Sequence, residues 1–263
     1  MSPHAAPRRV PIGNGWQWIV RGWRLVARKP LTWLMFTLVT WAIVSAGAIH
    51  PVVFAAIAVF LPVVLAGWTK ACVEAEAGRS IPVTMLFSGF RGAVRDLASI
   101  GGINLMVNMA LMLVLFALGG DLFTTAMSKP ETLTPDQAIE LRDRMSVAMI
   151  IIIAIGLPMA LAVWFAPVAV VLDGQRGPVA LLTSLRAIVR NALPFALYTA
   201  VLIGLATVAF GLFSALGLPR ITAMEVAFWA LMPLMVTSVY VSYRDIHPAE
   251  QTGEPAAPEE RPE

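Results

Sequence analysis

The chain has 263 residues, of which 58% are hydrophobic and 13% are charged, with a mean hydropathy of +0.77 and a formal net charge of +3. This composition carries far more apolar surface than one water-facing domain can bury, so it excludes a soluble globular protein and predicts an integral membrane protein. A β-barrel is also excluded, because runs such as MIIIIAIGLPMALAVWFAPVAVV do not alternate polar and apolar residues.

The chain opens with a segment that we expect to be flexible, residues 1–14, followed by the basic and aromatic stretch GWQWIVRGWRLVARKPLTWL at residues 15–34. On a helix Gln17, Arg21, Arg24 and Arg28 form one narrow stripe, while apolar residues that include Trp16 and Trp23 cover most of the remaining surface. Tryptophan favours the headgroup region of a bilayer, and arginine extends toward water and phosphate. We therefore expect an interfacial helix that lies flat on the membrane before a proline turns the chain into the first span.

Six apolar stretches have the length of roughly 20 residues that a membrane-spanning helix needs. They lie at residues 31–49, 52–68, 99–118, 145–171, 194–216 and 221–243. No cleavable signal precedes them, so we expect the first span to act as an uncleaved anchor. Together they predict an all-α, polytopic membrane domain over residues 15–244, followed by a disordered tail at 245–263.

The distribution of Lys and Arg predicts which ends of the spans face the cytoplasm. Fifteen of the nineteen lie before the first span, between spans two and three, between spans four and five, or after the sixth. The positive-inside rule then places both termini in the cytoplasm of a bacterial inner membrane. The loop 119–144 is external on this assignment, and Thr134 followed by Pro135 predicts the start of a short external helix that leads into the fourth span.

A short pattern recurs three times, in GWRLVARKPLTWL, GFRGAVRDLASI and SLRAIVRNALPF. Each copy has a bulky apolar residue, an arginine, three mostly apolar residues and a second arginine, and each precedes a pair of spans. The second span of each pair contains an internal proline, which is Pro62, Pro167 or Pro233. We therefore predict three tandem units of interfacial amphipathic helix plus helical hairpin, at about residues 15–70, 78–172 and 177–244.

An Arg-x-x-x-Arg spacing puts both guanidinium groups on one face of a helix. With the first segment, the three copies predict a basic ring around the cytoplasmic end of the spans, which we call the arginine collar. It comprises Arg21, Arg24, Arg28, Arg91, Arg95, Arg186 and Arg190. Two interpretations remain open: the collar only fixes orientation and depth in the bilayer, or it binds anionic lipid headgroups or an acidic partner together with Trp16 and Trp23.

Few residues suggest chemistry inside the membrane. The three histidines are far apart in sequence, no phosphate-binding loop is present, and the single cysteine, Cys72, is interpreted as an apolar filler. We therefore expect no catalysis, no metal and no cofactor, and as partners the lipid bilayer but no nucleic acid.

Asn104 and Asn108 are four residues apart and share one face of the third span. An unpaired amide in hydrocarbon is costly, so we expect them to bond to other helices, with contact to a substrate as the alternative. The three span prolines are expected to kink their helices, and they would line a cavity if one exists.

The motifs GWQW, GWRLVARKPLTWL, FAPVAVVLDG and TSLRAIVRNALPF give the chain a resemblance to an uncharacterised family of proteobacterial six-helix inner-membrane proteins. The chain is also distantly similar to the membrane domain fused to some glycerophosphodiester phosphodiesterases. The resemblance covers about residues 15–243 and implies the topology but no catalytic residues, because phosphodiesterase chemistry resides in a soluble domain that this sequence lacks.

The sequence thus leaves three functions to compare. The favoured one is a non-catalytic protein that associates with anionic lipid, as a scaffold or an envelope-maintenance factor. The main alternative is a transporter or channel with a path between the repeats. A membrane enzyme is the least favoured, because the spans contain almost no ionisable residues.

Overall fold

A computed structural model describes residues 7–129 and 132–248, and every regular element in these ranges is helical. The elements in chain order are α1 (Asn14–Arg28), α2 (Pro30–Ala46), α3 (Pro51–Glu76), the 3₁₀ helix η1 (Val83–Arg91), α4 (Val94–Ser128), α5 (Pro135–Asp173), α6 (Gly177–Arg190), α7 (Ala192–Ala215) and α8 (Arg220–Ile246). The predicted all-α class is confirmed for this part of the chain.

The six predicted spans correspond to α2, α3, α4, α5, α7 and α8. Five of these, all except α2, are long and apolar enough to cross a membrane, and α2 reaches that standard only when it is counted together with α1 as one bent pair. Several helices extend beyond the apolar stretch that predicted them, since α3 continues to Glu76 and α4 to Ser128. Hydropathy locates the lipid-facing part of a helix, whereas turns and caps decide where the helix ends.

The predicted helix start at Thr134 and Pro135 is confirmed. The Thr134 side chain accepts from the Gln137 backbone N–H while the Gln137 side chain accepts from the Thr134 N–H, and Pro135 occupies the first turn of α5. This capping box satisfies two donors at the start of a 39-residue helix. On the other arm of the hairpin, α4 is broken at Gly120, whose φ of 54° and ψ of −146° are accessible mainly to glycine.

The axes of α1 and α2 meet at a bend of 99°. The bend falls at Lys29, which leaves the helical conformation at φ −145° and ψ 59°, immediately before Pro30. A residue that precedes proline is disfavoured in the helical region, which explains the break. A bend of this size is what the predicted turn from an interfacial helix into the first span requires.

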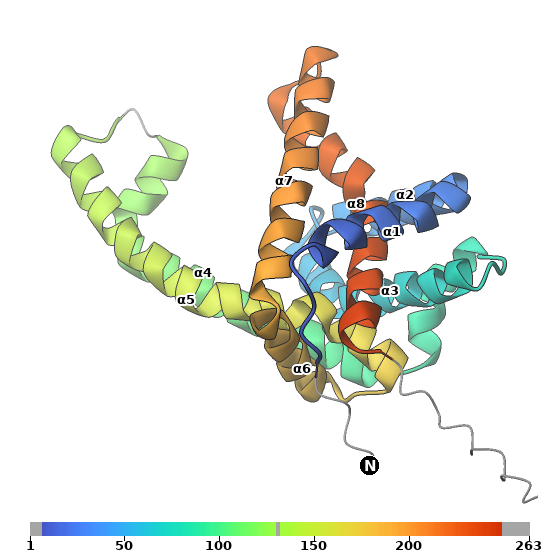
Figure 1. Ribbon diagram of the computed structural model, residues 1–263. Helices are drawn as coiled ribbons and strands as arrows, with labels where there is room; N and C mark the ends of the chain where they lie inside the picture. The colour runs from blue at the N-terminus through green and yellow to red at the C-terminus, as the bar shows by residue number, and fades with distance from the viewer. Residues whose placement is uncertain (1–6, 130–131, 249–263) are drawn as a thin grey trace, which may run out of the picture.

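Three hairpins, α2–α3, α4–α5 and α7–α8, diverge from a common region that we call the hub (Figure 1). The hub consists of α1, η1, α6 and the C-terminal ends of α3, α5 and α8. In Figure 1 the α4–α5 hairpin extends to the left, α7 points upward and α2 and α3 extend to the right. Large apolar side chains remain exposed along the hairpins, among them Leu113, Ile150 and Val208, as expected for surfaces that face lipid.

The short hub helices pack in a consistent order. η1 packs against α3 of the first hairpin, α6 packs against α4 and α5 of the second, and α1 packs against α7 and α8 of the third. Each short helix therefore contacts the hairpin that precedes it in the chain, and α1 closes the circle by contacting the last one.

Aromatic residues occupy the centres of two apolar clusters. In one cluster Trp18 and Phe165 both lie against Phe195, with ring centroids 5.1 and 5.5 Å from it. In the other, Trp33 stacks on Trp68 with centroids 5.6 Å apart. These clusters join the hairpins to one another at the hub.

The segments on either side of the membrane domain were predicted to be flexible or disordered. The described part of the expected flexible N-terminus, residues 7–14, is instead tied to the hub: Val10 N–H donates to Asn191 Oδ1 over 2.9 Å, and Arg8 pairs with Asp245. The tail predicted to be disordered begins at residue 245, but Asp245 and Ile246 are the last residues of α8; residues 249–263 of this tail lie outside the described residues.

Candidate functional site

The predicted interfacial helix, α1, has one buried and one exposed face. The buried face packs against α7 and α8 and contains Gly15, Trp18, Ile19, Gly22, Leu25 and Val26. The apolar side of this helix is therefore mainly a protein contact, which corrects the expectation that it faces lipid. Trp16 and Trp23 are the exception, since they are 54% and 58% exposed. Next to them, Arg21, Arg24 and Arg28 are exposed, and Arg21 donates to Gln17 Oε1 over 2.8 Å.

The second copy of the arginine pattern is not one helix. Arg91 ends η1 and Arg95 lies in the first turn of α4, and between them Gly92 and Ala93 leave the helical conformation. The prediction that these two guanidinium groups share a helical face is therefore wrong. Gly92 occupies this break, whereas the first and third copies, which are continuous helices, have Leu25 and Ala187 at the corresponding position.

The arginine collar is nevertheless exposed as a set. All seven side chains are exposed: six lie on α1, η1 and α6, and Arg95 lies in the first turn of α4, directly after η1. The ion pairs found in residues 7–129 and 132–248 join other arginines to acids: Arg8 to Asp245, Arg79 to Glu74, Arg142 to Asp143 and Arg144 to Glu140. The collar thus presents positive charge that no acidic side chain in this part of the chain neutralises.

In each copy of the arginine pattern, a small residue comes directly before the bulky apolar residue and the first arginine. This small residue was not among the predicted site residues. A Cβ atom on Gly22 would lie 2.9 Å from Ser238 N of α8, and one on Gly89 would lie 2.1 Å from Val63 O of α3. The third member, Ser184, is buried against α5. All three positions allow a short hub helix to approach a proline-containing helix closely, and the repeated small residue was the signal that could have revealed them.

Ser184 also contacts the backbone of α5 close to Pro167. Phe165 N–H donates to the Ser184 hydroxyl over 3.0 Å, and that hydroxyl donates to Leu161 O over 2.6 Å. The hydroxyl therefore bridges two backbone groups that bond to each other in a regular α-helix, two positions before Pro167. Inserted side chains of this kind bend helices, so we expect α6 as well as Pro167 to shape this part of α5.

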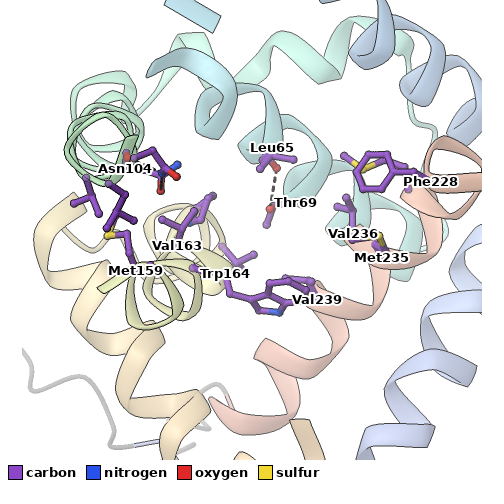
Figure 2. A pocket seen from close by; sticks show the side chains of 18 residues that line it. Leu65, Thr69, Asn104, Met159, Val163, Trp164, Phe228, Met235, Val236 and Val239 are labelled. Carbon is purple, nitrogen blue, oxygen red and sulfur yellow. Dashed lines mark hydrogen bonds between the residues drawn. The ribbon is translucent and has the colours of Figure 1, made fainter. Parts of the chain in front are cut away.

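A pocket of about 490 Å³ lies between α3, α4, α5 and α8, so it borders all three hairpins (Figure 2). It includes three of the five residues predicted to mark kinks or a cavity: Asn104 and Asn108 from α4 and Pro167 from α5. The other two, Pro62 and Pro233, are buried inside α3 and α8 and do not line it. No charged residue lines the pocket.

The two asparagines bond to each other rather than to another helix. Asn108 Nδ2 donates to Asn104 O over 2.8 Å and to Asn104 Oδ1 over 3.0 Å. Both are therefore satisfied in part within α4, and the expectation of interhelical hydrogen bonds is wrong. The spacing of four residues that places them on one face also brings the two amides together.

Three acids at the hub accept hydrogen bonds from other elements, and sequence reasoning missed all three. The Tyr240 hydroxyl of α8 donates to Glu76 Oε2 of α3 over 2.5 Å, and the Tyr243 hydroxyl donates to Asp173 Oδ2 of α5. Asp245 Oδ2 of α8 accepts from Trp18 Nε1 over 2.8 Å and from Asn14 Nδ2 over 2.7 Å. The end of α8 therefore connects to α1, α3 and α5.

His247, next to this network, gives a test of pH dependence. Its ring stacks on Tyr243 at 4.4 Å, and neither ring nitrogen has a hydrogen-bond partner among the described residues. Burial lowers the pKa of the His247 imidazole, against an opposing effect of Asp173. The unfolded chain therefore binds a proton on His247 at a higher pH than the folded chain does. The free energy of unfolding is highest above the ordinary imidazole pKa of about 6.5, and it falls as the pH drops through the lowered pKa.

We expect thermal unfolding in detergent to show this decline between about pH 8 and about pH 5. His247→Phe keeps an aromatic stack and should flatten the decline, whereas His50→Gln, an exposed control at the first hairpin tip, should not. Equal pH profiles for wild type and His247→Phe would show that other groups cause the loss.

Comparisons with known proteins give one significant relative. A probable inner membrane protein of Burkholderia thailandensis is 31% identical over 268 residues, which cover 95% of this chain and 96% of the relative. No protein-family model matches the chain, and no solved structure matches it. The predicted kind of protein, a proteobacterial inner-membrane protein, is supported, whereas the resemblance to the membrane domain of glycerophosphodiester phosphodiesterases receives no support.

Proposed function

We propose, since the chain belongs to the same family as the probable inner membrane protein of Burkholderia thailandensis, that it is a non-catalytic protein that associates with anionic lipid through its arginine collar. The chain is a multi-pass inner-membrane protein by this relationship and by its apolar helices. The hub and both termini are proposed to lie on the cytoplasmic side, where the excess of Lys and Arg is expected.

One observation carries the proposal: seven exposed guanidinium groups on α1, η1, α6 and the first turn of α4, none of which forms an ion pair within residues 7–129 and 132–248. A basic side chain near an anionic leaflet gains on the order of 1 kcal/mol. Trp16 and Trp23, which are exposed on α1 as the first three arginines are, have the amphipathic character suited to the headgroup region. Charge and position together favour anionic headgroups as the ligand.

The three-unit organisation is part of the proposal. It is supported by the cyclic packing of the short hub helices and by the small residue that each unit places against a proline-containing helix. Three similar units would distribute the arginines around the hub instead of on one side. That arrangement suits a collar that contacts several lipids at once.

The transport alternative has less support. A path for polar solutes needs polar or charged side chains along it. The pocket between the hairpins includes two asparagines and Pro167, but most of its lining is apolar. This lining favours a lipid environment over an aqueous path.

Lipid retention by the purified full-length protein tests the proposal. The protein in detergent is mixed with equal amounts of phosphatidylglycerol and phosphatidylethanolamine, and the lipid that co-purifies is measured by mass spectrometry. We expect an excess of phosphatidylglycerol, which high salt reduces. Replacing Arg24, Arg91 and Arg186 with Gln should remove about 3 kcal/mol of headgroup attraction and abolish most of the excess.

The matched control replaces Arg142 and Arg144 with Gln. These arginines are also exposed, but they lie outside the hub and already pair with Asp143 and Glu140. The control should retain the excess of phosphatidylglycerol. Equal retention of both lipids by the wild type, or no change in the collar variant, would refute the headgroup role.

A further inference from the structure

We propose that the pocket between the hairpins holds one acyl chain of a membrane phospholipid, with the ester carbonyl of that chain accepting a hydrogen bond from the Asn104 amide. The pocket is separate from the arginine collar, so this proposal goes beyond the proposed function and does not depend on it. It rests on the position of the pocket, its lining and the unused donors of one amide.

The position of the pocket favours a lipid. Four helices line it, and each of them is apolar and long enough to cross a membrane. The pocket is partly open to its surroundings, and the hairpins that border it diverge (Figure 1). The medium next to this part of the chain is hydrocarbon, so lipid chains have direct access.

The size and lining suit a flexible, uncharged chain. A volume of about 490 Å³ is within the range of about 300 to 1,000 Å³ found for small-molecule pockets. Met159, Met232 and Met235 contribute unbranched side chains from α5 and α8. Methionine adapts its shape to irregular partners, which matches the many conformations of an acyl chain. The absence of charged residues among the lining side chains excludes a headgroup as the occupant.

The amide of Asn104 supplies the polar contact. The hydrogen bond from Asn108 ends on Asn104 Oδ1, which identifies the other terminal atom as the NH₂ group. Among the described residues this NH₂ group has no acceptor, and the Asn104 side chain points from α4 toward the pocket (Figure 2). An amide donor without a partner in hydrocarbon is costly. The ester carbonyl is the hydrogen-bond acceptor that the acyl chain of a phospholipid carries, and it can accept from this NH₂ group.

Photolabelling tests the proposal with the full chain in liposomes. The probe is a phosphatidylethanolamine with a diazirine on one ester-linked acyl chain, and labelled peptides are identified by mass spectrometry. A zwitterionic headgroup is used so that the result does not depend on the collar. We expect labelling to concentrate on peptides of α5 and α8 that contain Met159 and Met232, and to persist in the collar variant.

Two substitutions fill the pocket from α5. Ala160→Phe adds a ring at an exposed residue of the lining, and Gly156→Leu adds a smaller side chain nearby. Both should reduce labelling of the pocket peptides at least fivefold. Ala154→Phe, at an exposed position of the same helix that does not line the pocket, should leave it unchanged. Labelling that spreads evenly over the hairpins, or that survives both pocket substitutions, would overturn the proposal.

The carbonyl contact has its own test. Asn104→Leu should lower labelling by the ester-linked probe about fivefold, which is the size expected for one net hydrogen bond. An ether-linked probe lacks the carbonyl, so it should label wild type and Asn104→Leu equally. If the ether-linked probe labels wild type as well as the ester-linked probe does, the hydrogen bond to Asn104 is disproved.

Discussion

Asp245→Ala is expected to lower the stability of the protein in detergent by about 3 kcal/mol. The Asp245 side chain is only 8% exposed, and its loss leaves Trp18 Nε1, on a completely buried residue, without its acceptor. The Arg8 side chain is 53% exposed, so water screens its ion pair and little of the loss comes from it. The free energy of unfolding in a denaturing detergent titration measures the effect.

Asp143→Ala is the matched control. This acid also pairs with an arginine, but its side chain is 66% exposed, so its removal should cost less than about 1 kcal/mol. Limited proteolysis provides a second measurement, because residues 7–14 should become accessible in Asp245→Ala only. If both variants lose the same small amount of stability, the contacts between the end of α8 and α1 are not an important part of the fold.

The second large effect is expected from Gly101→Ala. A Cβ atom at this position would lie 2.2 Å from Val59 O and 2.7 Å from Ala58 O, both on the backbone of α3. Backbone atoms cannot rotate away as a side chain can, so α3 and α4 must separate. We expect a loss of more than about 2 kcal/mol, since small residues allow membrane helices to approach closely.

The neighbouring glycine makes a stringent control. A Cβ atom on Gly102 would meet no atom within 4 Å, so Gly102→Ala should be neutral or stabilising by up to about 1 kcal/mol, because alanine favours the helix. Unfolding free energies of the two variants, measured side by side, separate helix packing from helix propensity. A stable Gly101→Ala protein would show that α3 and α4 are further apart than the structure places them.

Hydropathy predicted most of the fold, because a membrane helix needs a long apolar stretch whatever its neighbours are. The six spans and the start of α5 at Pro135 follow from such local signals. The contacts of Glu76, Asp173 and Asp245 could not be predicted in this way, because each of them joins residues far apart in the sequence. No local pattern marks an acid as the acceptor for a distant tyrosine or tryptophan.

The candidate site shows the same limit. Exposure of the arginines could be predicted, because a cationic group is expensive to bury. The break between Arg91 and Arg95 could not be read from their spacing alone, since that spacing predicts a shared face only where the helix is continuous. The amide pair was placed on one face correctly, but its bonding partner depended on rotamers that periodicity does not describe.

The circular packing of the hub has a consequence for biosynthesis. Trp18 and its acceptor Asp245 are 227 positions apart, and the helices that cover α1 are the last to be made. At about 5 to 20 residues per second, the ribosome needs roughly 10 to 45 s to produce them. During that interval the α1 face of Trp18 and Ile19 has no partner in the chain, so the nascent protein depends on the bilayer surface or an insertion factor to shield it. A translation product arrested before α8 would lack the helix that covers α1. The exposed apolar face of α1 would then give quality-control proteases a way to recognise that product.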